Sequence, residues 1–143
     1  AKGLYTVFDR HRFLTRLQLG AVATNDFSSI PPSLRFFAGG DQSVRGYAYQ
    51  TLSPVDNTGD TVGGRYLMAS TLEYQYEFID RWRAATFVDY GNAVDSPTDP
   101  LKTAVGLGIR WVSPIGPLRV DLARSLSDPQ EGFRIHFSMG PEL

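Results

Sequence analysis

The stretch "GRYLMASTLEYQYEF", residues 64–78, decides the fold because its side chains alternate in character along its whole length. The first parity, mostly apolar, consists of Tyr66, Met68, Ser70, Leu72, Tyr74, Tyr76 and Phe78. The second, mostly polar, consists of Arg65, Leu67, Ala69, Thr71, Glu73, Gln75 and Glu77. Side chains of a β-strand point alternately to its two faces, so the pattern predicts one long strand with an apolar and a polar face.

Similar alternation recurs along the chain, and it favours a membrane β-barrel over a soluble β-sandwich. The expected strands lie at residues 4–8, 13–23, 64–78, 82–92, 103–112, 118–124 and 133–139. Several approach the length of about 9–11 residues that a tilted membrane strand requires, which is long for a soluble sandwich. Aromatic side chains also gather near the ends of the apolar faces, for example Tyr74, Tyr76 and Phe78. Such aromatic girdles are typical of the interfaces of outer-membrane barrels.

The connecting segments alternate between short and long. The short ones are residues 9–12, 79–81 and 113–117, and the long ones are about 25–63, 94–102 and 125–132. Bacterial membrane barrels alternate short periplasmic turns with longer extracellular loops in this way. We therefore expect an all-β fold, about seven antiparallel strands forming the C-terminal portion of a transmembrane β-barrel in the bacterial outer membrane. Seven strands are too few to close here, so further strands are expected upstream of Ala1, which would lie outside the cell.

Composition argues against several other classes of function. The net charge of −1 gives no basic field for nucleic acid, and no apolar run approaches the length of a transmembrane helix. With no cysteine and only two histidines, His11 in an expected turn and His136 on the last strand, the sequence predicts neither a metal site nor a cofactor. No nucleophile elbow or phosphate-binding loop is present, so we do not expect an enzyme.

The segment "GGDQSVRGY", residues 39–47, lies within the longest connector and raises the question of what Arg45 contacts. A loop of about 40 residues is usually functional or disordered, and the adjacent phenylalanines of "LRFFAGG" argue against disorder. Glu73 and Asp89 fall on the polar parity of neighbouring strands, on either side of the short turn at 79–81. They are expected to be diagonal neighbours, and one guanidinium can bind both carboxylates. The hypothesis is therefore that Arg45 is the tip of a loop folded into the barrel.

Four segments carry a resemblance to a known family: "RFFAGGDQSVRGY", "LEYQYEF", "FVDYGNAV" and the ending "FSMGPEL". Together they resemble the C-terminal half of the barrel in the BamA/TamA superfamily of outer-membrane assembly and translocation proteins. The details "PPSLRFFAGGD" and "GPEL" resemble the TamA branch more than the BamA branch. The resemblance implies a barrel of 16 strands. In that family the barrel is preceded by periplasmic POTRA domains, which are absent from this chain. It also implies that residues 25–63 are the sixth extracellular loop, folded into the lumen.

The resemblance further implies a set of site residues. In the loop, Arg45 would contact the lumen acids Glu73 and Asp89, and the accompanying motif residues are Gly39, Gly40, Asp41, Val44, Gly46 and Tyr47. The last strand would carry an assembly signal of a polar residue, a glycine and two hydrophobic positions at Gln130, Gly132, Ile135 and Phe137. Gly140 and Pro141 are poor strand residues, so the end of this strand is expected to form a weak seam, which the resemblance implies is a lateral gate.

Three functions remain open at this point. The leading one is an outer-membrane factor that inserts or secretes autotransporter-type proteins through the seam. Its partners would be outer-membrane lipid, substrate outer-membrane proteins and an inner-membrane-anchored, TamB-like protein that spans the periplasm. The second is a dedicated secretion transporter of the same superfamily, either a two-partner exporter or the barrel of a patatin-type fusion. The third is a passive pore.

Overall fold

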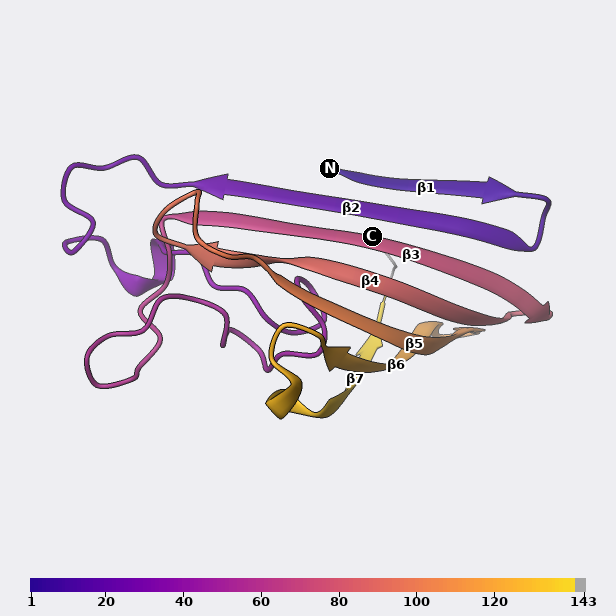
Figure 1. Ribbon diagram of the computed structural model, residues 1–143. Coiled ribbons are helices and arrows are strands. Elements are labelled where there is room, and N and C mark those ends of the chain that lie inside the picture. The colour runs from indigo at the N-terminus through magenta and orange to yellow at the C-terminus, as the bar shows by residue number, and fades with distance from the viewer. Residues whose placement is uncertain (141–143) are drawn as a thin grey trace.

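The computed structural model describes residues 1–140 and contains a single seven-stranded antiparallel sheet (Figure 1). The strands are β1 (Lys2–Val7), β2 (His11–Ala21), β3 (Tyr66–Ile79), β4 (Trp82–Val94), β5 (Lys102–Ser113), β6 (Gly116–Ser125) and β7 (Phe133–Met139). Two short 3-10 turns, η1 (Pro32–Leu34) and η2 (Pro129–Glu131), lie in the connections. Among these residues, no helix is long and apolar enough to cross a membrane. The all-β prediction is confirmed, and each of the seven predicted strands is present.

Every strand pairs with its neighbours in the sequence, so the sheet is a simple meander in the order β1 to β7. In the β3–β4 pair, Thr71 lies opposite Asp89 and Glu73 lies opposite Phe87. Glu73 and Asp89 are therefore diagonal neighbours on one face, as the sequence predicted. His11 differs from expectation, because it is the first residue of β2 and not part of the preceding turn. In the β2–β3 ladder His11 lies opposite Tyr76, and its Nδ1 is 2.7 Å from the hydroxyl of Tyr74.

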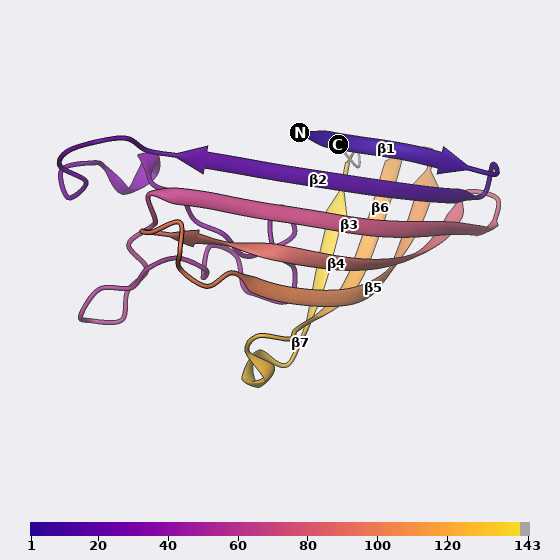
Figure 2. The ribbon, with the colours of Figure 1, turned by 45° about the horizontal axis from the view of Figure 1, so that its top comes forward.

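The sheet is strongly curved, and its two faces differ in chemistry. In Figure 2, β6 and β7 lie behind β2 to β5 and run at a steep angle to them, because the sheet curves round between β5 and β6. The outer face carries large exposed apolar side chains, such as Leu107 and Ile135, which are 66% and 75% exposed. Near the short turns, the outer rings of Trp82 and Trp111 stack with centroids 5.4 Å apart. The inner face is covered instead by the connection between β2 and β3.

That connection, residues 22–65, is an ordered part of the fold with its own apolar core. Ala38, Val44, Tyr47 and Leu52 of the loop are buried against Ala93 and Ala104 of the sheet. Phe36 lies so close to Gly20 of β2 that a Cβ there would sit 2.5 Å from its ring. Isolated β-bridges at residues 36 and 64, 38 and 52, and 55 and 61 brace the loop internally. The loop therefore packs on the sheet, and this packing accounts for the adjacent phenylalanines.

The two outer edges of the described sheet belong to β1 and β7, each of which pairs on one side within residues 1–140. Past the end of β7, the Gly140 N–H still donates to the Pro117 carbonyl at 3.0 Å. Gly140 then adopts a φ of +136°, which turns the backbone away from strand geometry. Pro141, the other predicted residue of this seam, lies outside the described residues.

The outward orientation of Leu107 yields the first prediction. Leu107→Arg should lower the free energy of unfolding of the lipid-embedded, full-length protein by about 2–4 kcal/mol, because it places a charge on an apolar outer face. Gln18→Arg, on the inner face of β2, is the matched control and should change stability far less. Denaturant unfolding in phospholipid vesicles measures both variants. Equal losses for the two would contradict the assignment of the outer face to lipid.

Candidate functional site

Glycines bring the loop tip close to the inner wall. Gly39, Gly40 and Gly46 have φ values of +102°, +97° and +96°, a region that favours glycine. At Gly46 there is also no space for a side chain, because a Cβ would lie 3.0 Å from the Ser125 backbone nitrogen of β6. The motif therefore supplies both the turns and the close backbone approach that carry Arg45 into the hollow of the sheet.

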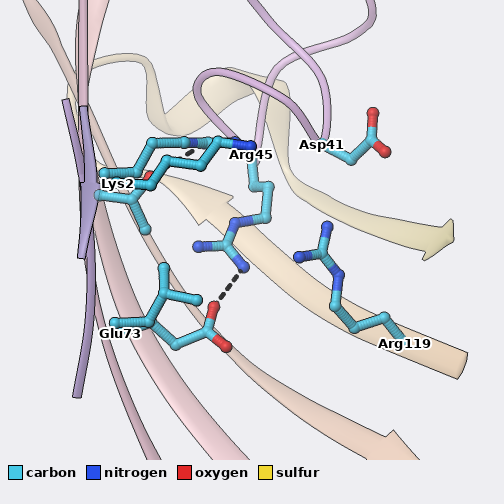
Figure 3. Close-up of a pocket in the computed structure, with 8 residues that line it drawn as sticks. Lys2, Asp41, Arg45, Glu73 and Arg119 are labelled. Carbon is cyan, nitrogen blue, oxygen red and sulfur yellow. Dashed lines mark hydrogen bonds and ion pairs between the residues drawn. The ribbon is translucent and has the colours of Figure 1, made fainter. Parts of the chain in front are cut away.

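Arg45 is bound by three carboxylates from three different strands. Its Nε and Nη2 donate to the two oxygens of Asp89 on β4 at 2.7 and 2.9 Å, and its backbone N–H donates to the same carboxylate at 3.0 Å. Its Nη1 donates to Glu73 on β3 at 2.9 Å, the contact dashed in Figure 3, and to Asp121 on β6 at 3.0 Å. The fork geometry of a guanidinium makes this multiple contact possible.

A second guanidinium completes the cluster. Arg110 of β5 donates through Nη2 to Glu73 at 2.9 Å and through Nη1 to Asp121 at 2.5 Å. Gln75 adds a hydrogen bond to Glu73 at 2.8 Å. We refer to Arg45, Arg110, Glu73, Asp89 and Asp121 as the Arg45 network. All five side chains are buried, Arg45 and Glu73 to within 2% of full burial, so each charge depends on its partners.

The sheet is shaped to hold this network. The guanidinium carbon of Arg45 lies 3.3 Å from the centroid of the Phe87 ring, a cation–π contact on the β4 wall. Gly106 and Gly108 of β5 leave the space that this ring and the Asp121–Arg110 pair occupy, since a Cβ at either glycine would collide with them. The run of small residues on the inner face of β5 before Arg110 is therefore a packing requirement of the network.

The loop tip also contacts the last strand and the connection that precedes it. The Gly46 N–H donates to His136 Nε2 of β7 at 3.3 Å. The Tyr47 hydroxyl donates to Asp128 at 2.7 Å and accepts from Ser125 at 2.5 Å. Hydrogen bonds from Lys102 and Tyr47 hold the pKa of Asp128 below its usual value, and burial raises the pKa of Tyr47 to about 12. Both groups therefore keep the protonation states that this contact requires at neutral pH.

The structure brings together the three residues that the sequence hypothesis placed in contact, Arg45, Glu73 and Asp89. Of the motif residues, Val44 and Tyr47 enter the loop core, and Gly39 donates its N–H to Ser43 at 2.7 Å. Asp41 lines a small cavity beside Arg45. Sequence reasoning missed Arg110 and Asp121 as members of the network. The alternation of side chains predicts that both residues face inward. The hypothesis for Arg45, however, considered only the acidic residues on either side of the turn between β3 and β4.

The residues of the expected last-strand signal are divided in the structure. Ile135 and Phe137 lie on the outer face of β7, as predicted. Gln130 and Gly132 lie before the strand, in the connector predicted at residues 125–132, and the assembly signal that they would form with Ile135 and Phe137 stays a prediction. Gln130 lies in η2 and Gly132 follows it with a φ of +69°, because the turn must reverse the chain before β7 begins.

Comparisons with known proteins agree with this architecture. The profile of the Omp85 superfamily domain matches residues 1–142. The outer membrane protein assembly factor BamA of Nitratidesulfovibrio vulgaris is 37% identical over 137 residues, covering 87% of this chain and 17% of the relative. BamA of Neorickettsia risticii is 30% identical over 88% of this chain and 19% of the relative. The chloroplastic outer envelope protein 80 of Arabidopsis thaliana is 31% identical over 90% of this chain and 17% of the relative.

A solved structure shows the same fold. The crystal structure of BamA from Haemophilus ducreyi lacking POTRA domains 1–3 superposes with a TM-score of 0.71 at 22% identity, covering 96% of this chain and 32% of that one. This chain therefore spans less than a fifth of the length of the BamA and envelope relatives, and about a third of the solved chain.

Removing the central guanidinium gives the second prediction. Arg45→Ala should lower the free energy of unfolding of the full-length protein by about 3–5 kcal/mol, because three carboxylates lose their shared cation. Arg45→Lys keeps the charge but not the fork, so most of the loss should remain. The temperature at which the folded band converts on a heat-modifiability gel measures the effect. Wild-type behaviour of Arg45→Ala would show that the network does not support the barrel.

Asp121 provides the third prediction, since only the structure identifies it. Asp121→Asn removes a charge shared by Arg45 and Arg110 and should cost about 2–4 kcal/mol of unfolding free energy. Asp128→Asn is the matched control, because Asp128 lies at the partly exposed rim and its ion pair with Lys102 should be worth less than about 1 kcal/mol. If Asp128→Asn lost as much unfolding free energy as Asp121→Asn, or more, the contact at Asp128 would hold the loop more strongly than the buried network does.

Proposed function

This chain belongs to the Omp85 superfamily, and we propose that it forms the C-terminal part of an outer-membrane β-barrel that inserts and assembles other outer-membrane proteins. Its location is the outer membrane. The observation that carries the proposal is the match of residues 1–142 to the superfamily domain, with 37% identity to a relative named as an outer-membrane protein assembly factor. We do not propose an enzymatic activity, and the named relatives support this choice.

The edge of β7 that has no partner within residues 1–140 supports a mechanism for insertion. The Gly140 N–H bonds to the carbonyl of Pro117, and β-ladder bonds alternate along a strand. The N–H groups of Phe133, Ile135, Phe137 and Met139 therefore point away from β6. An incoming strand can pair with this row of backbone donors and acceptors, as in other cases of strand addition. The outer side chains of the same residues are apolar, so a strand paired there would pass directly into lipid.

The Arg45 network would give this edge a firm support. It joins β3, β4, β5 and β6 through side chains of the inner wall, and His136 links the loop tip to β7. A strand edge templates a partner only when its own position is fixed, because a mobile edge must lose more conformational entropy on pairing. We therefore assign the loop a bracing role beside the site of strand addition.

A second candidate is the narrower role of a TamA-like factor for autotransporter-type substrates. The segments "PPSLRFFAGGD" and "GPEL" favour it, because they resemble the TamA branch. This candidate adds an inner-membrane-anchored, TamB-like partner that spans the periplasm. The two candidates share the same edge and the same loop, and they differ in the substrates that depend on the protein.

A proline substitution tests the free edge and gives the fourth prediction. Ile135→Pro removes one outward N–H of β7 without removing a bond to β6. In vesicles that contain the full-length protein, the rate at which an unfolded outer-membrane barrel inserts should fall roughly five- to tenfold, the effect of losing about one backbone hydrogen bond. Ile135→Ala retains the N–H and is the matched control.

Two outcomes distinguish the candidates. Slower insertion of simple barrels and of autotransporters alike supports the general assembly role, whereas an effect confined to autotransporters supports the TamA-like role. If Ile135→Pro inserted both substrates at the wild-type rate while remaining folded, the free edge of β7 would not be the site of insertion.

A further inference from the structure

We propose that the inner wall of the sheet carries a binding site for a carboxylate, formed by Lys2, Arg16 and Arg119 next to the Arg45 network. Neither the superfamily match nor the proposed assembly function assigns such a site. Figure 3 shows the space concerned, with Arg119 pointing towards the guanidinium of Arg45 from one side and Lys2 on the other. The three cations come from β1, β2 and β6, so the fold places them together and the sequence does not.

Two positively charged side chains lie directly opposite each other on neighbouring strands at this position. Lys2 of β1 and Arg16 of β2 are cross-strand partners on the inner face, an arrangement that destabilises a strand pair unless a counter-charge is present. Arg16 lies within electrostatic range of Asp89 and Glu73, which attract it, and of Arg45 and Arg119, which repel it. All four basic side chains line one cavity of about 20 Å³, enough for a single water-sized group such as one carboxylate oxygen.

Within residues 1–140, none of the three cations forms an ion pair. Arg16 donates through Nη2 to the Ser43 carbonyl at 3.1 Å and to the Thr71 hydroxyl at 2.9 Å, which are both neutral acceptors. The side chain of Arg119 donates no hydrogen bond to any residue of the described chain. The Nε atoms of Arg16 and Arg119 are buried there without an acceptor. Buried donors of this kind are rare and costly, and they indicate an acceptor that arrives from outside this chain segment.

Charge balance indicates what that acceptor is. Around the network, five cations face four carboxylates: Lys2, Arg16, Arg45, Arg110 and Arg119 against Asp41, Glu73, Asp89 and Asp121. Among residues 1–140, this group carries one more positive than negative charge. A carboxylate supplies one negative charge and two planar oxygens that suit guanidinium donors. A phosphate group carries more negative charge than this difference.

The carboxylate can come from either of two sources. One is an Asp or Glu side chain elsewhere in the same protein, facing these strands across the hollow of the sheet. The other is a free or transient group, such as an acidic residue of a polypeptide inside the barrel. Both would make the same contacts with Arg119. One variant of Arg119, compared with the wild type in two salts, distinguishes the two sources.

The experiment, which gives the fifth prediction, uses the full-length protein folded in detergent. Its unfolding midpoint is measured on heat-modifiability gels in sodium chloride and in sodium acetate at equal ionic strength and neutral pH. An exchangeable site predicts that acetate raises the wild-type midpoint by about 2–4 °C and that Arg119→Gln abolishes the rise. A site filled by the protein's own carboxylate predicts equal midpoints in the two salts and a fall with Arg119→Gln in both.

The opposite result would overturn the proposal. If no anion is bound, Arg119→Gln relieves repulsion, so the midpoint should rise or stay unchanged in both salts. Arg12→Gln is the matched control, because Arg12 lies on the inner face of β2 but does not line the cavity. A response to acetate that Arg12→Gln abolished as fully as Arg119→Gln would indicate a general salt effect and would likewise reject the site.

Discussion

The structure depends on the burial of one guanidinium. Arg45 arrives on a loop, yet its side chain is almost completely removed from solvent and surrounded by Asp89, Glu73 and Asp121. Transferring an arginine into such a place is unfavourable unless every charge is matched. The inner face of the sheet therefore has to present carboxylates at three heights on three strands. The curvature of the sheet, the register of β3 against β4 and the position of β6 together meet that requirement.

Small residues provide the space that this charge network occupies. Gly46 lets the loop backbone touch β6, while Gly106 and Gly108 open the inner face of β5 for an aromatic ring and an ion pair. Glycine weakens a strand interior, so its repeated use on β5 is a local cost that the network offsets. The wall is consequently stiff where the loop docks. Among the described residues, β6 pairs with one edge of β7, the loop tip bonds to that strand at His136, and the other edge has no partner.

The sequence allowed the fold to be predicted well because strand parity is a local signal. Every inward residue of the Arg45 network fell on the correct face from alternation alone. The pairing of Arg45 with Glu73 and Asp89 followed from one short turn between two strands. Arg110 and Asp121 are also diagonal neighbours, across the short turn between β5 and β6. Their contacts with Glu73 and Arg45 depend on the curvature from β3 to β6, which no local pattern encodes.

The meander has a consequence for the order in which this part of the protein can form. Each strand pairs with the one before it, so hairpins can add one after another from local contacts. The network is different, because Arg45 must wait for Asp121, which is 76 residues further along the chain. Contacts of such long separation form late. The loop can therefore dock fully only after β6 has joined the sheet, and its final seat at His136 requires β7. A fully docked loop therefore indicates that β6 and β7 have already joined the sheet.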